Sequence, residues 1–140
     1  MGDRRMTCLD TSVLIDIIRG NESVRELSDK IDKTEIIPSI ASPSIVELIK
    51  GINLKDNLKY IRIEKREKIG EILSRFSILS LDMESAVLAG KIEAELINKG
   101  KMVDIEDIMI AAIAIENDET LITRNTKHFE NIKGLKVENY

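Results

Sequence analysis

Acidic and amide side chains occur at four places in the sequence where they could take part in metal chemistry. These are Asp10 after the apolar run 6–9, Glu47 within a helical pattern, the pair Asp104 and Asp107, and Asn125 after the run 120–123. Carboxylate and amide oxygens suit Mg²⁺, which binds through one or two carboxylates and keeps several waters. If the chain folds so that these residues meet, they could hold a divalent cation that activates water.

Most of these residues also have a plain structural interpretation. Asp10 and Asp104 precede helical patterns and could serve as N-caps. Asn125 fits an ordinary turn. Asp107 could stabilise the first turn of its helix through the helix dipole. That helix is apolar on nearly every side, however, and a buried carboxylate needs a partner, a metal or a water-filled cleft. The pattern leaves both interpretations open.

Glu47 is the acidic residue that the pattern supports least. Its helix has a clear start, with Ser42 as the predicted N-cap and Pro43 as the first helical residue. Glu47 lies roughly opposite the apolar stripe of this helix, which consists of Ile45, Leu48, Ile49 and Ile52. By helical phase alone, Glu47 is therefore expected to be solvated.

Short branched apolar runs alternate with longer helical patterns along the chain. The runs predict strands at residues 6–9, 36–40, 78–81, 120–123 and 135–137. Apolar stripes predict helices around residues 13–18, 24–31, 45–52, 83–97 and 105–115. This alternation indicates an α/β fold, a twisted parallel sheet of about five strands with helices on both faces, in three layers. Ligands of such sheets bind at the carboxyl ends of the strands, where Asp10 and Asn125 are predicted to lie.

The stretch between residues 55 and 76 gives a weaker helical pattern. Residues 64–68 are continuously charged, which predicts a break or an exposed elbow. The same stretch holds the densest group of basic residues, Lys59, Arg62, Lys65, Arg66, Lys68 and Arg75. A solvated face with Glu–Lys pairs is the favoured interpretation, and a nucleic-acid patch is the alternative.

Composition limits the class of protein. The 140 residues carry a net charge of −4, which argues against coating nucleic acid by bulk attraction. The length fits one domain, placed at residues 6–140, with residues 1–5 as a flexible N-terminal extension. Cys8, the only cysteine, lies in an apolar run and is expected to be a buried structural thiol. No signal peptide or membrane span is indicated, so we predict a cytoplasmic protein.

Several blocks of the sequence together resemble the VapC branch of the PIN-domain nucleases. They are Leu9–Asp16, Ser44–Leu48, Asp107–Ala114 and Leu121–Asn125, followed by Phe129, Gly134 and Leu135. The blocks occur in the family's order and extend over residues 6–137. The first and last are the most specific, whereas the block around Glu47 is recognised mainly by its position.

The resemblance implies a site that pattern alone does not give. Asp10, Glu47 and Asp107 would converge on one acidic pocket for Mg²⁺ or Mn²⁺. Asp10 and Asp107 would hold the metal, and Glu47 would bind it or orient the attacking water. Hydrogen-bond donors around these acids would be Thr11, Ser12 and Thr123.

Other expectations also follow from the resemblance. Many PIN nucleases carry a fourth carboxylate where this chain has Asn125, and Asp104 could compensate for it, although an N-cap role suits Asp104 better. The implied activity is endonucleolytic RNA cleavage by a metal-activated water, in the toxin of a type II toxin–antitoxin pair. A homodimer and a small VapB-like antitoxin are the implied partners. His128, the only histidine, is expected at the surface.

Three other functions compete with this one. A PIN module could bind RNA or an antitoxin without cleaving anything. A phosphotransferase of the haloacid-dehalogenase kind would need a second Asp two residues after Asp10, where Ser12 stands. A receiver-like signalling domain could use Asp82 as phosphoacceptor, but it would need an acidic pair at the end of the first strand and a lysine after the last strand.

Overall fold

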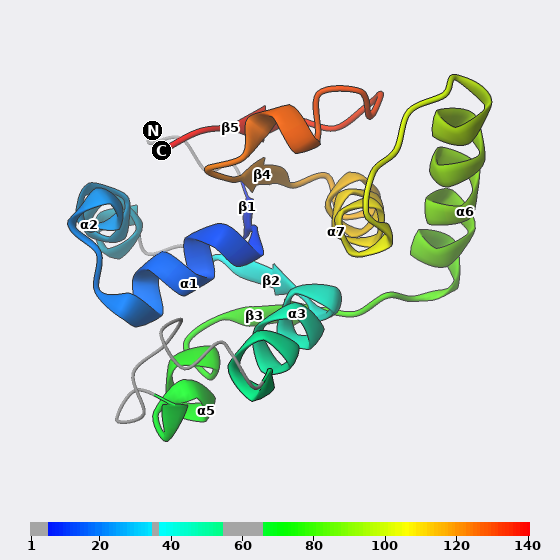
Figure 1. Ribbon diagram of the computed structural model, residues 1–140. Helices are drawn as coiled ribbons and strands as arrows, with labels where there is room; N and C mark the ends of the chain where they lie inside the picture. The colour runs from blue at the N-terminus through cyan, green and yellow to red at the C-terminus, as the bar shows by residue number, and fades with distance from the viewer. Residues whose placement is uncertain (1–5, 35–36, 55–65) are drawn as a thin grey trace.

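The central element of the fold is one parallel sheet. The computed structural model describes residues 6–34, 37–54 and 66–140. The sheet has the strand order β3-β2-β1-β4-β5 (Figure 1). Its strands are β1 (Thr7–Leu9), β2 (Ser39–Ala41), β3 (Ser77–Leu79), β4 (Thr120–Ile122) and β5 (Val137–Glu138), all paired in parallel. The predicted α/β class with about five parallel strands is confirmed.

The predicted strands lie close to the observed ones. β1 and β4 fall within the predicted runs, and β3 and β5 are shifted by one or two residues. β2 begins at Ser39, later than predicted. Residues 35 and 36, where that prediction began, lie outside the described residues.

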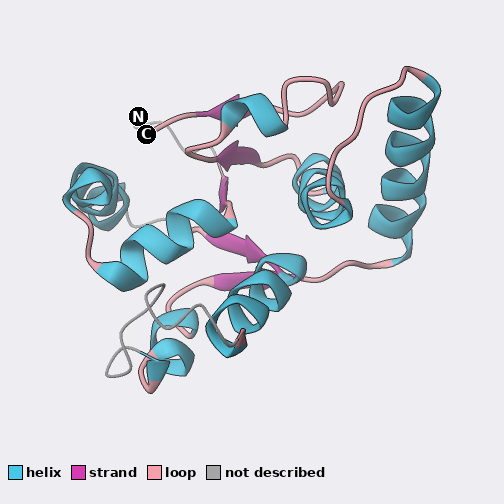
Figure 2. Cartoon of the chain, in the orientation of Figure 1, coloured by secondary structure: helices cyan, strands magenta, loops and turns pink. Residues whose placement is uncertain are grey.

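Helices fill the connections between the strands (Figure 2). They are α1 (Thr11–Arg19), η1 (Glu22–Val24), α2 (Arg25–Thr34), α3 (Ser42–Asn53), α5 (Ile69–Leu73), α6 (Met83–Asn98), α7 (Ile105–Glu116) and η2 (Thr126–His128). Each predicted helical stripe lies within one of these elements or, for residues 24–31, at the join of η1 and α2.

The two faces of the sheet are covered by different helices. Because successive residues of a strand point to opposite faces, neighbours within β1 and β4 belong to different apolar clusters. Cys8 and Leu121 pack with α6 and α7, whereas Leu9 and Ile122 pack with α1, η1 and α2. Figure 1 shows α1 and α2 on one side of the central strands and α6 and α7 on the other. The predicted three-layer arrangement is thereby confirmed.

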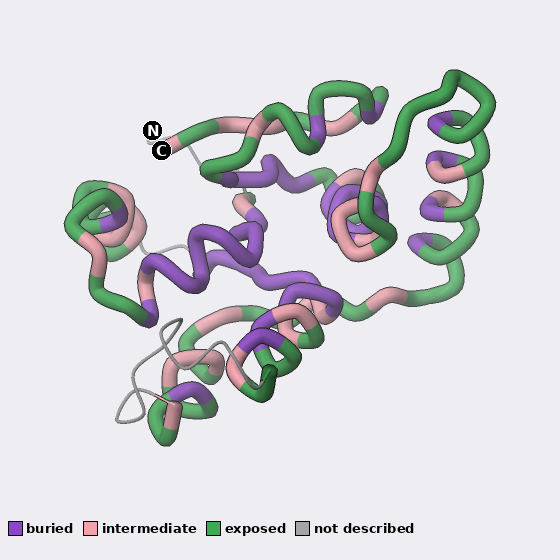
Figure 3. The backbone as a smooth tube through the Cα atoms, in the orientation of Figure 1, coloured by how far each residue is buried: buried purple, intermediate pink, exposed green. Residues whose placement is uncertain are grey.

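The middle of helix α7 is buried, as its apolar sequence predicts (Figure 3). Ile110 and Ile113 are completely buried, as are the alanines between them. Cys8 is also fully buried beneath this layer, and burial raises the pKa of its thiol to about 12. Cys8 is therefore an inert core residue, as predicted.

The charged segment is only partly described. Glu67 and Lys68 lie exposed in a turn that precedes α5, in agreement with the predicted break. Residues 64 and 65, the basic residues Lys59 and Arg62, and the predicted N-terminal extension at residues 1–5 lie outside the described residues. Within the ranges that are described, no helix has the length and apolar composition needed to cross a bilayer.

Packing around α7 predicts a clear contrast between two isoleucine truncations. Ile113→Ala should lower the free energy of unfolding by about 2–5 kcal/mol, because it leaves a cavity in a fully buried position. Ile97→Ala, at a position 61% exposed on α6, should cost less than about 1 kcal/mol. Urea unfolding of both variants measures the difference. Equal losses would show that α7 does not carry the core.

Candidate functional site

Asp10 follows β1, the strand from which the chain continues to one side of the sheet through β2 and β3 and later to the other side through β4 and β5. β1 is flanked by β2 and β4, so the next strand in sequence and a much later strand meet on either side of it. Such switch points in parallel sheets leave a crevice at the carboxyl ends of the strands. The Asp10 backbone N–H donates to the carbonyl of Ile122 at 2.9 Å, which extends the β1–β4 pairing to Asp10 itself.

The Asp10 side chain does not cap the helix that follows it. Asp10 occupies the N-cap position of α1, but its carboxylate makes no capping hydrogen bond. Its Oδ2 instead accepts hydrogen bonds from Thr123 Oγ1 at 2.8 Å and Ser12 Oγ at 3.2 Å. Only 4% of Asp10 is exposed. The carboxylate is therefore held in a fixed, largely dry position by hydroxyls from two segments.

Glu47 points toward the same region, so the prediction of a solvated side chain was wrong. Its Oε1 accepts a hydrogen bond from Thr11 Oγ1 at 2.8 Å, and the residue is half-buried. The apolar stripe does pack into the core through Ile45, Leu48 and Ile52, but it is not the only covered face, because α3 packs against both α1 and α7. The face turned inward follows Ser44, Leu48 and Gly51, all buried, whereas Ile49 is 40% exposed.

The start of α3 also differs from the prediction. Ala41, not Ser42, occupies the N-cap position, and Ser42 is the first helical residue, followed by Pro43. The Ser42 hydroxyl accepts a hydrogen bond from the backbone N–H of Leu81 at 3.2 Å. A serine that could have capped its own helix is thus used to fix the chain that leaves β3.

Asp107 brings the third carboxylate from α7. Burial, together with the negative charges of Asp10 and Glu47, raises its pKa from 3.8 to about 7, while the charge of His128 opposes the shift. Burial also raises the pKa of Glu47, and the charge of Asp10 adds to this shift, whereas the hydrogen bond from Thr11 lowers the pKa. These mutual effects show that the three acids share one electrostatic environment.

The remaining predicted residues lie at the margin of this environment. Asp104 occupies the N-cap position of α7, as predicted, but is exposed and makes no capping hydrogen bond. The Asn125 N–H donates to Thr123 Oγ1 at 3.0 Å, and its exposed side chain makes no hydrogen bond to the described residues. His128 is 58% exposed, yet its Nδ1 lies 3.6 Å from Asp107 Oδ2. The expected surface histidine therefore also borders the acids.

A buried acid that the sequence analysis assigned no role lies on the next turns of α1. Asp16 is fully buried, and its carboxylate accepts hydrogen bonds from Arg124, Asn21 and the hydroxyl of Tyr140. The left-handed Gly20, with φ of 69°, ends α1 and turns the chain so that Asn21 reaches Asp16 at 2.8 Å. The feature of the sequence that could have pointed to Asp16 is its position as the one acidic residue among the apolar residues 13–18.

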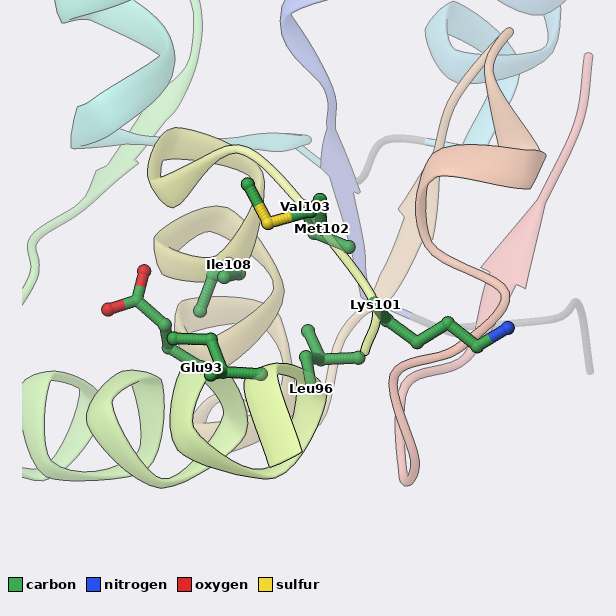
Figure 4. Close-up of a pocket in the computed structure, with 7 residues that line it drawn as sticks. Glu93, Leu96, Lys101, Met102, Val103 and Ile108 are labelled. Atoms are coloured by element: carbon green, nitrogen blue, oxygen red, sulfur yellow. The ribbon is translucent and has the colours of Figure 1, made fainter. Parts of the chain in front are cut away.

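An apolar pocket lies elsewhere in the molecule (Figure 4). It is formed by α6, the loop that follows it and α7, and its lining includes Leu96, Met102 and Ile108. The charged groups of Glu93 and Lys101 point away from each other at its rim. None of the three acids lines this pocket. The acidic cluster, with its charge and its hydroxyl donors, remains the candidate site.

The acids supply oxygen ligands of the kind that hard divalent cations prefer. Among residues 6–34, 37–54 and 66–140, no three His, Cys, Asp or Glu side chains are arranged to hold a metal ion by themselves. The acids are hard oxygen donors, and the charge of Asp10 raises the pKa of both Glu47 and Asp107, so a divalent cation would relieve their repulsion. This suits a cation such as Mg²⁺, which needs only one or two carboxylates besides water and phosphate.

Comparison with known proteins decides the family. The sequence pattern of the PIN domain matches residues 7–135. The tRNA(fMet)-specific endonuclease VapC of Salmonella typhimurium is 32% identical over 134 residues, which cover 94% of this chain and 96% of that protein. The chain belongs to the VapC branch of the PIN-domain family. Ribonuclease VapC1 of Methanocaldococcus jannaschii is 33% identical over 132 residues, 92% of this chain and 84% of the relative.

Solved VapC structures share the fold. A VapBC2 complex from Rickettsia felis, bound to promoter DNA, superposes with a TM-score of 0.80 at 25% identity, over 96% of this chain and 98% of that one. DNA-bound VapBC from Salmonella typhimurium gives 0.79 at 29% identity, with the same coverage of both chains. Membership of this family sets aside the phosphotransferase and receiver alternatives. Asp82, the residue that a receiver would use, caps α6 through the Ser85 N–H at 2.8 Å.

The raised pKa of Asp107 predicts how stability depends on pH. Its folded-state pKa of about 7 exceeds the ordinary 3.8, so the folded state binds this proton more tightly than the unfolded chain. The associated stability is complete below pH 4 and is lost as the pH rises toward 7. In chelator at pH 8, Asp107→Asn should therefore unfold at higher urea than wild type, by on the order of 2 kcal/mol, and should show a weaker decline with pH.

The opposite sign would contradict the shared site. If Asp107 only stabilises the first turn of α7, its neutralisation should cost about 0.3–1 kcal/mol at pH 8. Asp29→Asn, the same change at an exposed position on α2, controls for net charge and should leave the pH dependence of wild type intact.

Proposed function

We propose that this chain is the endoribonuclease toxin of a type II toxin–antitoxin pair and that it requires Mg²⁺ or Mn²⁺. The observation that carries the proposal is that the charge of Asp10, directly after β1, raises the pKa of both Glu47 and Asp107, in a chain that belongs to the VapC branch. Half-buried acids whose pKa values are raised by desolvation and by a neighbouring charge are typical of functional sites.

Asp10 and Asp107 are the residues that would hold the cation. Asp10 is fixed through one oxygen by Thr123 and Ser12, and its Oδ1 accepts no hydrogen bond from the described residues. Asp107, whose pKa is raised by the charge of Asp10, lies in the first turn of α7, where the helix dipole favours negative charge. When bound, the cation lowers the pKa of a coordinated water and screens the charge on the phosphate.

The protein's own groups orient the reaction. Glu47, held by Thr11 through one oxygen, would direct its second oxygen at the attacking water and accept its proton. The raised pKa of Glu47 makes it a better base than a solvated glutamate. Thr11, Ser12 and Thr123 would keep the carboxylates in place, since positioned hydrogen bonds preserve the geometry of metal ligands.

Partners and setting form part of the same proposal. The structural relatives are VapBC complexes, so we expect a small VapB-like antitoxin to bind this chain. The homodimer implied by the family resemblance and the domain bounds of 6–140 remain predictions. We place the protein in the cytoplasm because its RNA substrate is there. A PIN module that binds RNA without cleaving it is the alternative that the activity assay excludes.

Cleavage should require added divalent metal and should depend on Asp10. Purified protein free of antitoxin is incubated with a tRNA(fMet) transcript and an unstructured RNA, because the name of the Salmonella relative specifies that tRNA. We expect endonucleolytic products with Mg²⁺ or Mn²⁺ and none in chelator. Asp10→Asn should lose about 10²-fold or more in rate, because the metal that activates water is weakened.

Matched variants make the assay decisive. Asp29→Asn removes the same charge from exposed α2 and should retain wild-type cleavage. Full cleavage in excess chelator, or by Asp10→Asn, would rule out the proposed mechanism. RNA binding without cleavage under every metal condition would support the non-catalytic alternative instead.

A further inference from the structure

Arg124 is a fixed but half-exposed cation beside the acidic cluster. Its Nη1 donates to both oxygens of Asp16, at 2.9 and 3.0 Å. Asp16 is fully buried, whereas 53% of the Arg124 side chain is exposed. An arginine has five N–H donors, and Nη1 carries two of them. The Nε and Nη2 donors make no hydrogen bond to the described residues, so this edge of the guanidinium is available to a ligand.

The backbone of Arg124 is joined directly to the residues that hold Asp10. The Arg124 N–H donates to Ser12 Oγ at 3.3 Å, and Ser12 Oγ donates to Asp10 Oδ2. Thr123, the preceding residue, donates to the same oxygen. Asp16 lies one helical turn beyond Ser12 on α1, about 6 Å along the helix axis. The guanidinium is thereby anchored on α1, the helix that follows Asp10.

The charge of the site calls for such a cation. The chain has a net charge of −4, and the charges of Asp10 and Glu47 act on Asp107, so RNA phosphates are repelled unless cations lie nearby. Lys50, on the next turn after Glu47, lies 3.7 Å from Glu106. Arg124 differs because its partner carboxylate is completely buried, which leaves the positive edge as the part that faces solvent.

We propose that Arg124 binds a backbone phosphate of the RNA next to the one that is cleaved. This inference rests on the proposed ribonuclease function. Asp16 holds Nη1 and thus orders the side chain in advance, while the Nε and Nη2 edge offers the paired donors that suit a phosphate. Asp16, Asn21 and Tyr140 then act as positioning residues for this contact.

Salt dependence of RNA binding separates this contact from a purely structural ion pair. Binding of a fluorescein-labelled single-stranded RNA is followed by anisotropy in chelator over a range of KCl. One phosphate contact contributes about 0.7 to the slope of log K against log[salt]. Asp16→Asn should keep the wild-type slope, because Arg124 keeps its charge. Asp16→Asn combined with Arg124→Gln should lose about 0.7 of the slope.

The double variant avoids leaving an unpaired charge in the core, since both charges are removed together. Arg25→Gln, at an exposed arginine 4.0 Å from Glu22, is the matched control and should keep the full slope. The inference would be overturned if Asp16→Asn and the double variant had equal slopes. This holds whether both slopes equal that of wild type or both are smaller by the same amount. Wild type that cleaves RNA but binds it without salt dependence would also overturn it, and would leave the ribonuclease function intact.

Arg124→Lys gives a second test if thermal melting shows that the double variant is unfolded. A lysine has no separate edges with which to contact a carboxylate and a phosphate at once. We expect the KM for RNA to rise several-fold with kcat within about twofold, because binding and not chemistry is weakened. An unchanged KM would overturn the inference. Wild type without any metal-dependent cleavage would instead refute the ribonuclease function itself.

Discussion

The parallel pairing of β1 with β4 is the constraint on which the site depends. Residues 7–9 pair with residues 120–122, although more than a hundred residues separate them. This register sets the ends of both strands level, so Asp10 and Thr123 leave the sheet side by side and hydrogen-bond each other. A shift of one residue would turn Thr123 to the other face of the sheet and remove this bond.

The same pairing accounts for the second acidic network. Arg124 follows Thr123 and reaches Asp16 on α1, the helix that Asp10 begins. Asp10 and Asp16, both buried, thus have different hydrogen-bond partners. Asp16 has a cation and further donors, whereas Asp10 has only hydroxyls and faces other carboxylates. The acids around Asp10 lack a positive partner and would need a cation. The network around Asp16 has Arg124 as its positive partner and holds the neighbouring chain in place.

The sequence predicted the fold well because apolar periodicity reports burial directly. The buried α7 and the alternation of strands with helices both follow from it. Asp10 and Asp107 were also accessible, one as a strand-end acid and one as an acid in a wholly apolar helix. Their convergence was not, because it depends on the strand order, which periodicity does not encode; only the family resemblance implied it.

Glu47 and Asp16 show the limits more clearly. Helical phase placed Glu47 in solvent, because a stripe of isoleucines was taken as the only buried face of α3. The helix contacts two neighbours, α1 and α7, and its buried residues include Ser44 and Gly51 besides Leu48 of the stripe. Asp16 stood out only as a charge among apolar residues. Its partners Arg124 and Tyr140 lie at the other end of the chain, where no local pattern could connect them.

The central claim is that Asp10, Glu47 and Asp107 form one cation site at the end of β1. Substoichiometric Mn²⁺ added to ¹⁵N-labelled protein tests it most directly, because the paramagnetic ion broadens the amide signals nearest to it. We predict that broadening centres on the amides of these three residues and spares α2. Broadening centred on another part of the molecule, or uniform weak broadening, would contradict the account.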